Sequence, residues 1–121
     1  MAKQKPSVTI HLDKQREIYF TMQALEEIEE ALQIDNVFEL LNEGVLSAKM
    51  TNALAWAGMI HKEPNLSRKE AARRLSEGIQ RDGFDNVAMQ LQRALLLGLG
   101  IDPDKAEEEA KQKAEEEEAK N

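Results

Sequence analysis

The stretch that decides the fold runs from Val8 to Leu32 and reads VTIHLDKQREIYFTMQALEEIEEAL. Near its start, apolar residues recur at every second position on both sides of a polar run, at Val8, Ile10, Leu12, Ile18 and Phe20. This period of two is typical of half-buried strands, and the polar run over Asp13–Arg16 supplies a connection between two of them. The stretch therefore begins with a predicted β-hairpin.

From Thr21 the apolar period changes to that of a helix. One arc of the helical wheel collects the apolar residues Ala24, Leu25, Ile28, Ala31 and Leu32. The acidic residues Glu26, Glu29 and Glu30 occupy the opposite side. This segment predicts an amphipathic helix that packs through one face.

Two helices are predicted in the centre of the sequence. Asp35 is a candidate N-cap for a short helix through Leu41, and Gly44 lies beyond its end. Ser47 is a candidate N-cap for a longer helix over 48–61. Because apolar residues surround most of this longer helix, we expect it to be central or to meet a partner.

Two further helices follow. The sequence Ser67-Arg-Lys-Glu70 is a capping box, in which Ser67 accepts from a backbone amide and Glu70 reaches back to the cap. It predicts a helix that ends at Gly78. Asp85 is the predicted cap of the next helix, which covers 86–97.

A charged tail closes the sequence. Asp102 is a good N-cap and Pro103 suits the first helical position, but the residues beyond offer no apolar face. We therefore predict a disordered N-terminus (1–7), one globular domain (8–101) and an acidic, partly helical or disordered tail (102–121). The predicted fold class is mainly α (α+β), with an N-terminal β-hairpin packed on about five short helices.

The composition excludes several classes of protein. Cysteine is absent, which excludes disulfides and thiolate metal sites. The polar start and the short apolar runs give no sign of a secretion signal or a membrane span. Residues 102–121 hold nine of the 23 acidic and four of the 16 basic residues, so the remainder carries a net charge of only −2. This charge distribution argues against a nucleic-acid binder.

No catalytic, cofactor-binding or metal site is predicted. His11 alternates with apolar residues and so should face solvent, whereas His61 ends a helix, where the dipole favours a cation. The serines lack a Gly-x-Ser-x-Gly setting, and Gly98-Leu-Gly100 is too short for a dinucleotide fingerprint. The side chains favour a protein that acts by binding and is not an enzyme.

Five residues are candidates for binding a partner: Trp56, Met59, Met89, Arg93 and Leu96. The first two extend the apolar surface of the central helix, although such residues more often belong to a core. Met89 and Leu96 lie opposite the main apolar face of their helix, with Arg93 between them. This second stripe indicates a partner surface as readily as burial, and methionine adapts to varied partner shapes.

A basic cluster is the best case for nucleic-acid binding, and consists of Arg68, Lys69, Arg73, Arg74 and Arg81. A helix that carries these residues could lie along phosphates. Acidic residues interleave with them, however, and no aromatic residue accompanies them. A salt-bridged outer face is therefore the preferred interpretation.

The segment YFTMQALEEIEEAL over 19–32 resembles the tail assembly chaperones of long-tailed bacteriophages and the related protein of gene transfer agents. A short hairpin precedes it, and LLNEG at 40–44 and an apolar helix over 50–60 follow it. The resemblance covers approximately residues 8–100 in the order and spacing of the elements. A diffuse apolar pattern around Leu25-Glu26 carries it, and there are no active-site residues to transfer.

The resemblance implies a helical protein of the bacterial host cytoplasm that binds the tape measure protein and helps recruit tail tube subunits. It also implies departure before the tail is complete, so that the mature virion lacks the protein. A chaperone of a long rod meets many different segments, which favours adaptable apolar contacts. Self-association stays open, as do two other functions: a small DNA-binding regulator that uses Arg68–Arg74, and a structural component retained in the virion.

The resemblance further implies a longer product made by ribosomal slippage near the stop codon. Ala119-Lys120-Asn121 can be encoded GCA-AAA-AAC, which contains the slippery heptamer A-AAA-AAC. The charged tail is then a linker to the extension. Reading the gene tests this hypothesis, because the synonymous codon AAG at Lys120 excludes that heptamer.

Overall fold

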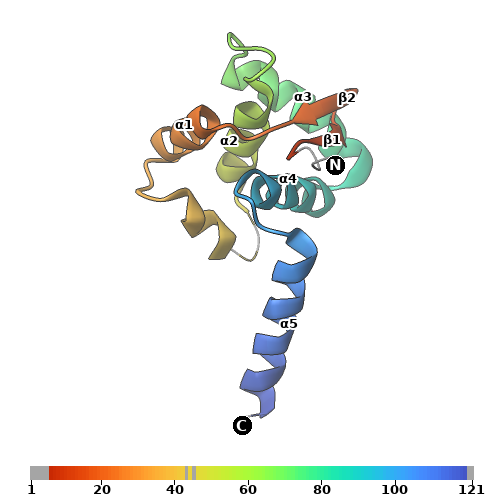
Figure 1. The fold of residues 1–121 in the computed structure, drawn as a ribbon. Coiled ribbons are helices and arrows are strands. Elements are labelled where there is room, and N and C mark those ends of the chain that lie inside the picture. Colours follow the sequence, from red (N-terminus) through yellow and green to blue (C-terminus); the bar gives the residue numbers. More distant parts are fainter. Residues whose placement is uncertain (1–5, 43, 45, 120–121) are drawn as a thin grey trace, which may run out of the picture.

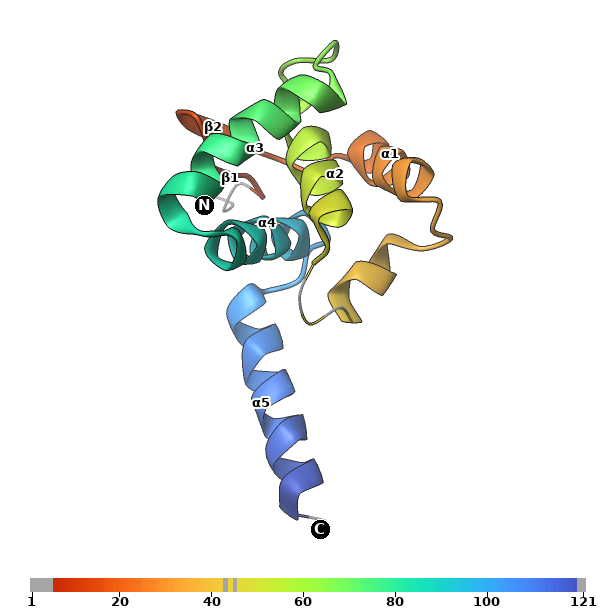
Figure 2. The same cartoon turned by 180° about the vertical axis from the view of Figure 1, so that it is seen from behind.

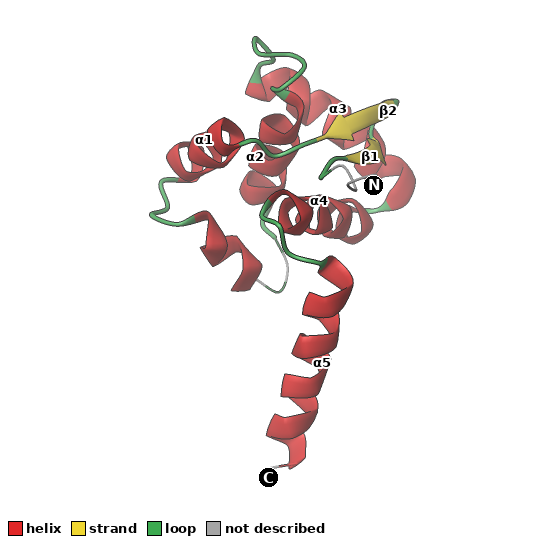
Figure 3. Cartoon of the chain, in the orientation of Figure 1, coloured by secondary structure: helices red, strands yellow, loops and turns green. Residues whose placement is uncertain are grey.

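The structure is a computed structural model that describes residues 6–42, 44 and 46–119. Its elements, distinguished in Figure 3, are β1 (Val8–His11), β2 (Gln15–Ile18), α1 (Met22–Leu32), the 3-10 helix η1 (Val37–Asn42), α2 (Ala48–Met59), α3 (Arg68–Asp82), α4 (Phe84–Gly98) and α5 (Pro103–Ala119). The fold is mainly helical with an N-terminal antiparallel β-hairpin, which confirms the predicted fold class.

Helix α2 is the centre of the molecule. It contacts α1, α3, α4 and β2. Figures 1 and 2 show α1 and η1 on one side of α2, and the hairpin and α3 on the other. Most of its residues are buried, namely Thr51, Ala53, Leu54, Ala55, Ala57, Gly58 and Met59. The apolar surface around this helix therefore serves several neighbours within the chain.

The connection of the hairpin is shorter than the predicted Asp13–Arg16. The strands pair from Val8 opposite Ile18 to His11 opposite Gln15, so residues 15 and 16 belong to β2. The connection is residues 12–14. Its Leu12 is fully buried, so the turn itself contributes an apolar side chain to the core.

Helix α1 begins as predicted. The Thr21 side-chain oxygen accepts a hydrogen bond from the Ala24 amide at 3.1 Å, which satisfies one of the free amides of the first turn. Ala24 and Ile28 of the predicted arc are fully buried. The Glu26 and Glu30 side chains are exposed on the other side. The amphipathic pattern thus decides which face of α1 packs.

The short helix η1 does not begin with the predicted cap at Asp35. The Asn36 side chain accepts from the Phe38 amide at 2.9 Å, and the Glu29 carboxylate accepts from the Val37 amide at 2.8 Å. Glu29 lies in α1, so part of this cap comes from another element and exists only when α1 and η1 are packed together.

Both serine caps that the sequence predicts are present. The Ser47 hydroxyl accepts from the Met50 amide at 3.1 Å at the start of α2, and the Ser67 hydroxyl accepts from the Glu70 amide at 3.0 Å at the start of α3. The predicted return of the Glu70 carboxylate to the cap is replaced by hydrogen bonds from arginines of α3. A charged donor forms the stronger hydrogen bond to a carboxylate.

Helix α3 does not end at Gly78, as predicted, but continues to Asp82. A Cβ atom at Gly78 would lie 3.2 Å from the Leu12 Cα and 3.3 Å from the His11 carbonyl oxygen. This glycine therefore lets the hairpin backbone approach the helix closely.

The turn between α3 and α4 is at Gly83, whose φ of 90° is readily available to glycine. Helix α4 begins directly after it at Phe84 and has no side-chain cap. The predicted cap at Asp85 is wrong, since this residue lies in the first turn of the helix.

Helix α5 starts as predicted. The Asp102 carboxylate accepts from the Asp104 amide at 3.0 Å, and Pro103 takes the first helical position. The helix contacts α4 at its start and then projects away from the body (Figure 1). No helix among the described residues is long and apolar enough to cross a membrane.

Two predictions fall partly on residues outside those described. Residues 1–5 of the predicted disordered N-terminus lie outside them, as do Lys120 and Asn121 of the proposed slippage sequence.

Candidate partner-binding surface

Three of the five predicted partner-binding residues lie together on α4. Met89 is 49% exposed, and the Leu96 side chain is half-buried. The Arg93 guanidinium group forms an ion pair with Asp104 at 2.8 Å, which joins α4 to the first turn of α5. The buried face of the helix consists of Val87, Ala88, Leu91, Ala94 and Leu95. The second stripe of α4 is thus open to solvent at Met89.

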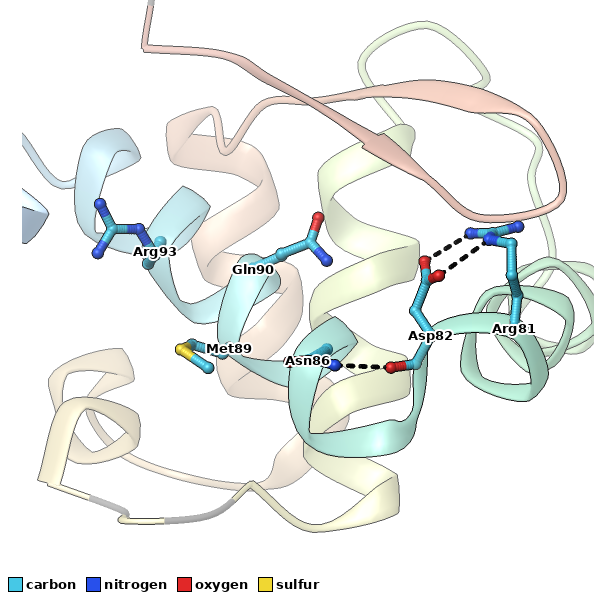
Figure 4. A pocket seen from close by; sticks show the side chains of 6 residues that line it. All are labelled: Arg81, Asp82, Asn86, Met89, Gln90 and Arg93. Carbon is cyan, nitrogen blue, oxygen red and sulfur yellow. Dashed lines mark hydrogen bonds and ion pairs between the residues drawn. The ribbon is translucent and has the colours of Figure 1, made fainter.

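An open depression of about 490 Å³ adjoins Met89. It is lined by Arg81, Asp82, Asn86, Met89, Gln90 and Arg93. In Figure 4 the Arg81–Asp82 pair lies at one end of this depression, and Met89 and Arg93 lie at the other. Because five of its six lining residues are polar, this depression suits contact with a mixed surface better than enclosure of an apolar ligand.

The other two predicted residues lie on α2 and do not join this stripe. Met59 is only 2% exposed and its sulfur accepts from an Arg74 nitrogen at 3.6 Å, so it belongs to the core. Trp56 is half-buried, and its indole nitrogen donates to the Leu66 carbonyl at 2.8 Å. The Arg68 guanidinium lies 5.7 Å from its ring centroid. These contacts within the chain leave Met59 no surface for a partner.

Two exposed apolar residues are not among the partner-binding residues predicted from the sequence. Met22 is 71% exposed at the start of α1, and Phe38 is 47% exposed in η1. Met22 lies outside the apolar arc of α1, so the helical wheel carried a signal for it. Phe38 could not be assigned this way, because the short 3-10 helix has neither the length nor the period of an α-helix.

Hydrogen bonds join the three elements that carry Met22, Phe38 and Met89. The Glu29 carboxylate links α1 to the first amide of η1 at 2.8 Å. The Gln92 side-chain amide of α4 donates to the Leu40 carbonyl of η1 at 3.3 Å. The most exposed large apolar side chains of the described residues therefore lie on three consecutively linked elements, α1, η1 and α4.

The arginines of α3 are engaged within the chain. Arg74 is buried and pairs with Glu63 at 2.7 Å and Glu70 at 3.0 Å. Arg73 pairs with Glu70 and with Glu77 at 2.8 and 2.9 Å. Hydrogen bonds from these arginines lower the pKa of Glu70 to about 2. This arrangement matches the predicted salt-bridged face.

Arg81 is engaged in a different way. Its guanidinium donates to the Leu12 carbonyl at 2.9 Å and to the His11 carbonyl, and it pairs with Asp82 at 2.9 Å. It therefore fastens the turn of the hairpin to the end of α3. The hydrogen bond from Arg81 lowers the pKa of Asp82.

The two histidines differ in exposure and in contacts. His11 is exposed, as predicted, whereas His61 is half-buried with its Nε2 atom 3.5 Å from a Glu17 oxygen. The His61 ring stands edge-on to the Tyr19 ring, with centroids 5.5 Å apart. Lys62 also pairs with Glu17 at 2.9 Å, and its hydrogen bond lowers the pKa of that carboxyl. These contacts hold the end of α2 against β2.

Metal ligands do not gather in the part of the chain that the structure describes, where no group of three or more His, Asp or Glu residues could hold an ion. Comparison of the chain with models of protein families, with curated proteins and with solved structures finds no match.

Proposed function

We propose that this protein is a tail assembly chaperone of a long-tailed bacteriophage or a related particle. It binds the tape measure protein in the cytoplasm of the bacterial host, helps recruit tail tube subunits and leaves before the virion is mature. The action is binding without catalysis. A longer product made by slippage at 119–121 provides the proposed link to the tail tube protein.

One observation carries the proposal. Met22, Phe38 and Met89 expose large apolar side chains on α1, η1 and α4, which are linked to one another. Two of the three are methionines, whose unbranched side chains adapt to different partner shapes. A chaperone that covers many unlike segments of one rod needs such contacts, because fixed hydrogen-bond patterns would select a single sequence.

The resemblance over 19–32 supports the same function from the sequence. Its apolar arc includes Ala24 and Ile28, which pack α1 on the core. Its remaining face is acidic and carries Met22. The resemblance thus covers α1, one of the three linked elements that carry the exposed apolar side chains.

Co-expression tests the proposal. The partner is the product of a long reading frame that follows this gene, and its soluble fraction is measured with and without this chain. We expect a large soluble fraction only when the chain is present. An equal soluble fraction in both cases would overturn the proposal.

A matched pair of variants assigns the activity to the exposed side chains. The triple variant Met22→Ser, Phe38→Ser and Met89→Ser should lose most of the solubilising effect. The control changes exposed polar neighbours on the same three elements: Gln23→Ser, Asn42→Ser and Gln90→Ser. The control should behave like the wild type, because it removes little apolar surface.

Two further measurements separate the proposal from its alternatives. A DNA-binding regulator would shift DNA in a low-salt mobility titration, where electrostatic binding is strongest. A structural tail component would be found by mass spectrometry of purified virions. The chaperone proposal predicts no shift and no virion-associated protein.

A further inference from the structure

The segment that carries α1 and η1 has charge of a single sign. Between Arg16 and Lys49 the sequence holds eight acidic residues and no basic residue. By contrast, α3 carries arginines that pair with acidic residues of the same chain. Figure 2 shows α1 and α3 on different sides of α2, so the segment with only acidic charges and the helix with paired arginines lie apart.

Exposed acidic and apolar side chains lie together on α1 and η1. Met22, Glu26 and Glu30 follow one another at intervals of four residues on the exposed side of α1. Such residues lie on one face of a helix. η1 adds Phe38 and Glu39, both exposed. The hydrogen bond from the Val37 amide to the Glu29 carboxylate joins η1 to α1. We call these five exposed residues of the two joined elements the acidic face.

The carboxylates of the acidic face are not used for ion pairs within the described residues. The ion pairs of that part of the chain involve other acids, and Glu26, Glu30 and Glu39 take part in none of them. Their charges repel one another at close spacing. A cationic partner relieves this repulsion.

We propose that the acidic face docks a basic amphipathic helix of the partner protein. Apolar side chains of that helix contact Met22 and Phe38, and its lysines or arginines pair with Glu26, Glu30 and Glu39. Helix α1 has 11 residues and is about 16 Å long, which matches about three turns of a partner helix. This inference rests on the proposed function and specifies which segments of the tape measure protein are bound.

Two labelled peptides test the docking. One is a helix of about 20 residues with leucine at intervals of three and four residues and lysine at most other positions. The second has glutamate in place of each lysine. Fluorescence anisotropy of the full chain with each peptide should show binding of the lysine peptide alone, and the affinity should fall at least about tenfold when salt screens the charges.

Charge variants locate the site on the acidic face. The double variant Glu26→Gln and Glu30→Gln should lower the affinity for the lysine peptide about fivefold, because two exposed ion pairs are lost. The control, Glu115→Gln with Glu116→Gln, removes the same charge from exposed positions of α5. Equal weakening by both pairs, or binding of the glutamate peptide as tightly as the lysine peptide, overturns the inference.

A second copy of this chain is the competing occupant, because Lys69 of α3 is exposed and basic. Sedimentation velocity of the chain alone measures this. Oligomers that disappear both in the Glu26 and Glu30 variant and in Lys69→Gln would assign the acidic face to self-association and overturn the proposal. A monomer that binds the lysine peptide supports it.

The test of the inference and the test of the function can fail separately. If peptide binding fails but co-expression still solubilises the tape measure protein, the chaperone proposal stands and the acidic face is not its docking site. If peptide binding succeeds but co-expression has no effect, the face binds basic helices and the proposed function is wrong.

Discussion

Arg74 of α3 forms a bidentate ion pair with Glu63, with Nη1–Oε2 at 2.7 Å and Nη2–Oε1 at 2.9 Å. Glu63 lies in the connection between α2 and α3. The same guanidinium reaches the Met59 sulfur in the core and Glu70 on α3. One buried charge thus links α3 to α2 and to the connection between the two helices.

The first prediction concerns this ion pair. Arg74→Ala should lower the free energy of unfolding by about 2 kcal/mol, because it removes a buried side chain and its hydrogen bonds. Arg73→Ala is the control, since Arg73 is largely exposed and its pairs are screened by solvent. Urea unfolding should rank Arg74→Ala clearly below Arg73→Ala; an equal effect contradicts the structural role of Arg74.

The second prediction concerns acid. Hydrogen bonds from Arg74 lower the pKa of Glu63 below its ordinary value of 4.5, and hydrogen bonds from Arg73 and Arg74 lower that of Glu70 to about 2. These carboxylates therefore contribute stability above about pH 4.5, which is lost as the pH falls through the folded pKa values. Urea midpoints should fall between about pH 5 and pH 2.

A variant identifies the source of this acid sensitivity. Glu63→Gln should reduce the loss of stability on acidification, because one titrating group with a lowered pKa is removed. Glu115→Gln on α5 is the charge-matched control and should keep the wild-type pH profile. Identical profiles for all three proteins would show that the Glu63 pair does not set the acid response.

The third prediction concerns the contact between α2 and β2 at Gly58. A Cβ atom there would lie 2.5 Å from the Ile18 Cγ2 atom. Gly58→Ala should therefore destabilise the protein by about 1–3 kcal/mol through overpacking, although alanine favours helix. Gly44→Ala meets no atom within 4 Å and should be nearly neutral. Thermal unfolding of both variants measures the two effects. A Gly58→Ala protein more stable than the wild type would contradict the close contact between α2 and β2 at this position.

The fourth prediction concerns α5. Deleting 104–121 should lower the helical circular dichroism signal but shift the melting temperature by less than about 5 °C. The reason is that α5 meets the body at its start, where Arg93 pairs with Asp104. Arg93→Ala in the full chain is the matching control for the lost pair. A large drop in melting temperature on deletion would show that α5 is part of the domain.

Local hydrogen bonds made several elements predictable. Thr21, Ser47, Ser67 and Asp102 each cap a helix through a backbone amide two or three residues further on. Both partners of such a hydrogen bond lie within a few residues of each other, so the local sequence is enough to predict the cap. The strand and helix periods of 8–32 are local in the same sense.

Long-range contacts explain two of the failures. A glycine such as Gly78 is typical of a helix end. Here its missing Cβ allows close approach of the hairpin backbone, which is more than 60 residues away in the sequence. The predicted cap at Asp35 gives way to Asn36 and to Glu29 of the neighbouring helix. The failure at Asp85 is local instead: the turn is made two residues earlier, at Gly83, and the helix begins directly after it.

The candidate surface divides in the same way. The wheel of α4 placed Met89 outside the buried stripe, and the structure exposes it. Met59 on α2 was also a candidate, although the core was the preferred interpretation, and α3 covers it through Arg74. Phe38 is exposed because η1 directs Val37 and Leu40 to the core instead.

The sequence by itself determined the order of the elements, the buried arc of α1, the caps at Ser47, Ser67 and Asp102 and the one-sign charge between Arg16 and Lys49, because each depends on residues close together in the chain. Only the tertiary structure decided the burial of Met59 and Arg74 and the linkage of α1, η1 and α4 that brings exposed apolar side chains onto connected elements. Burial depends on which helix packs over a residue, and that contact joins segments that no local pattern relates.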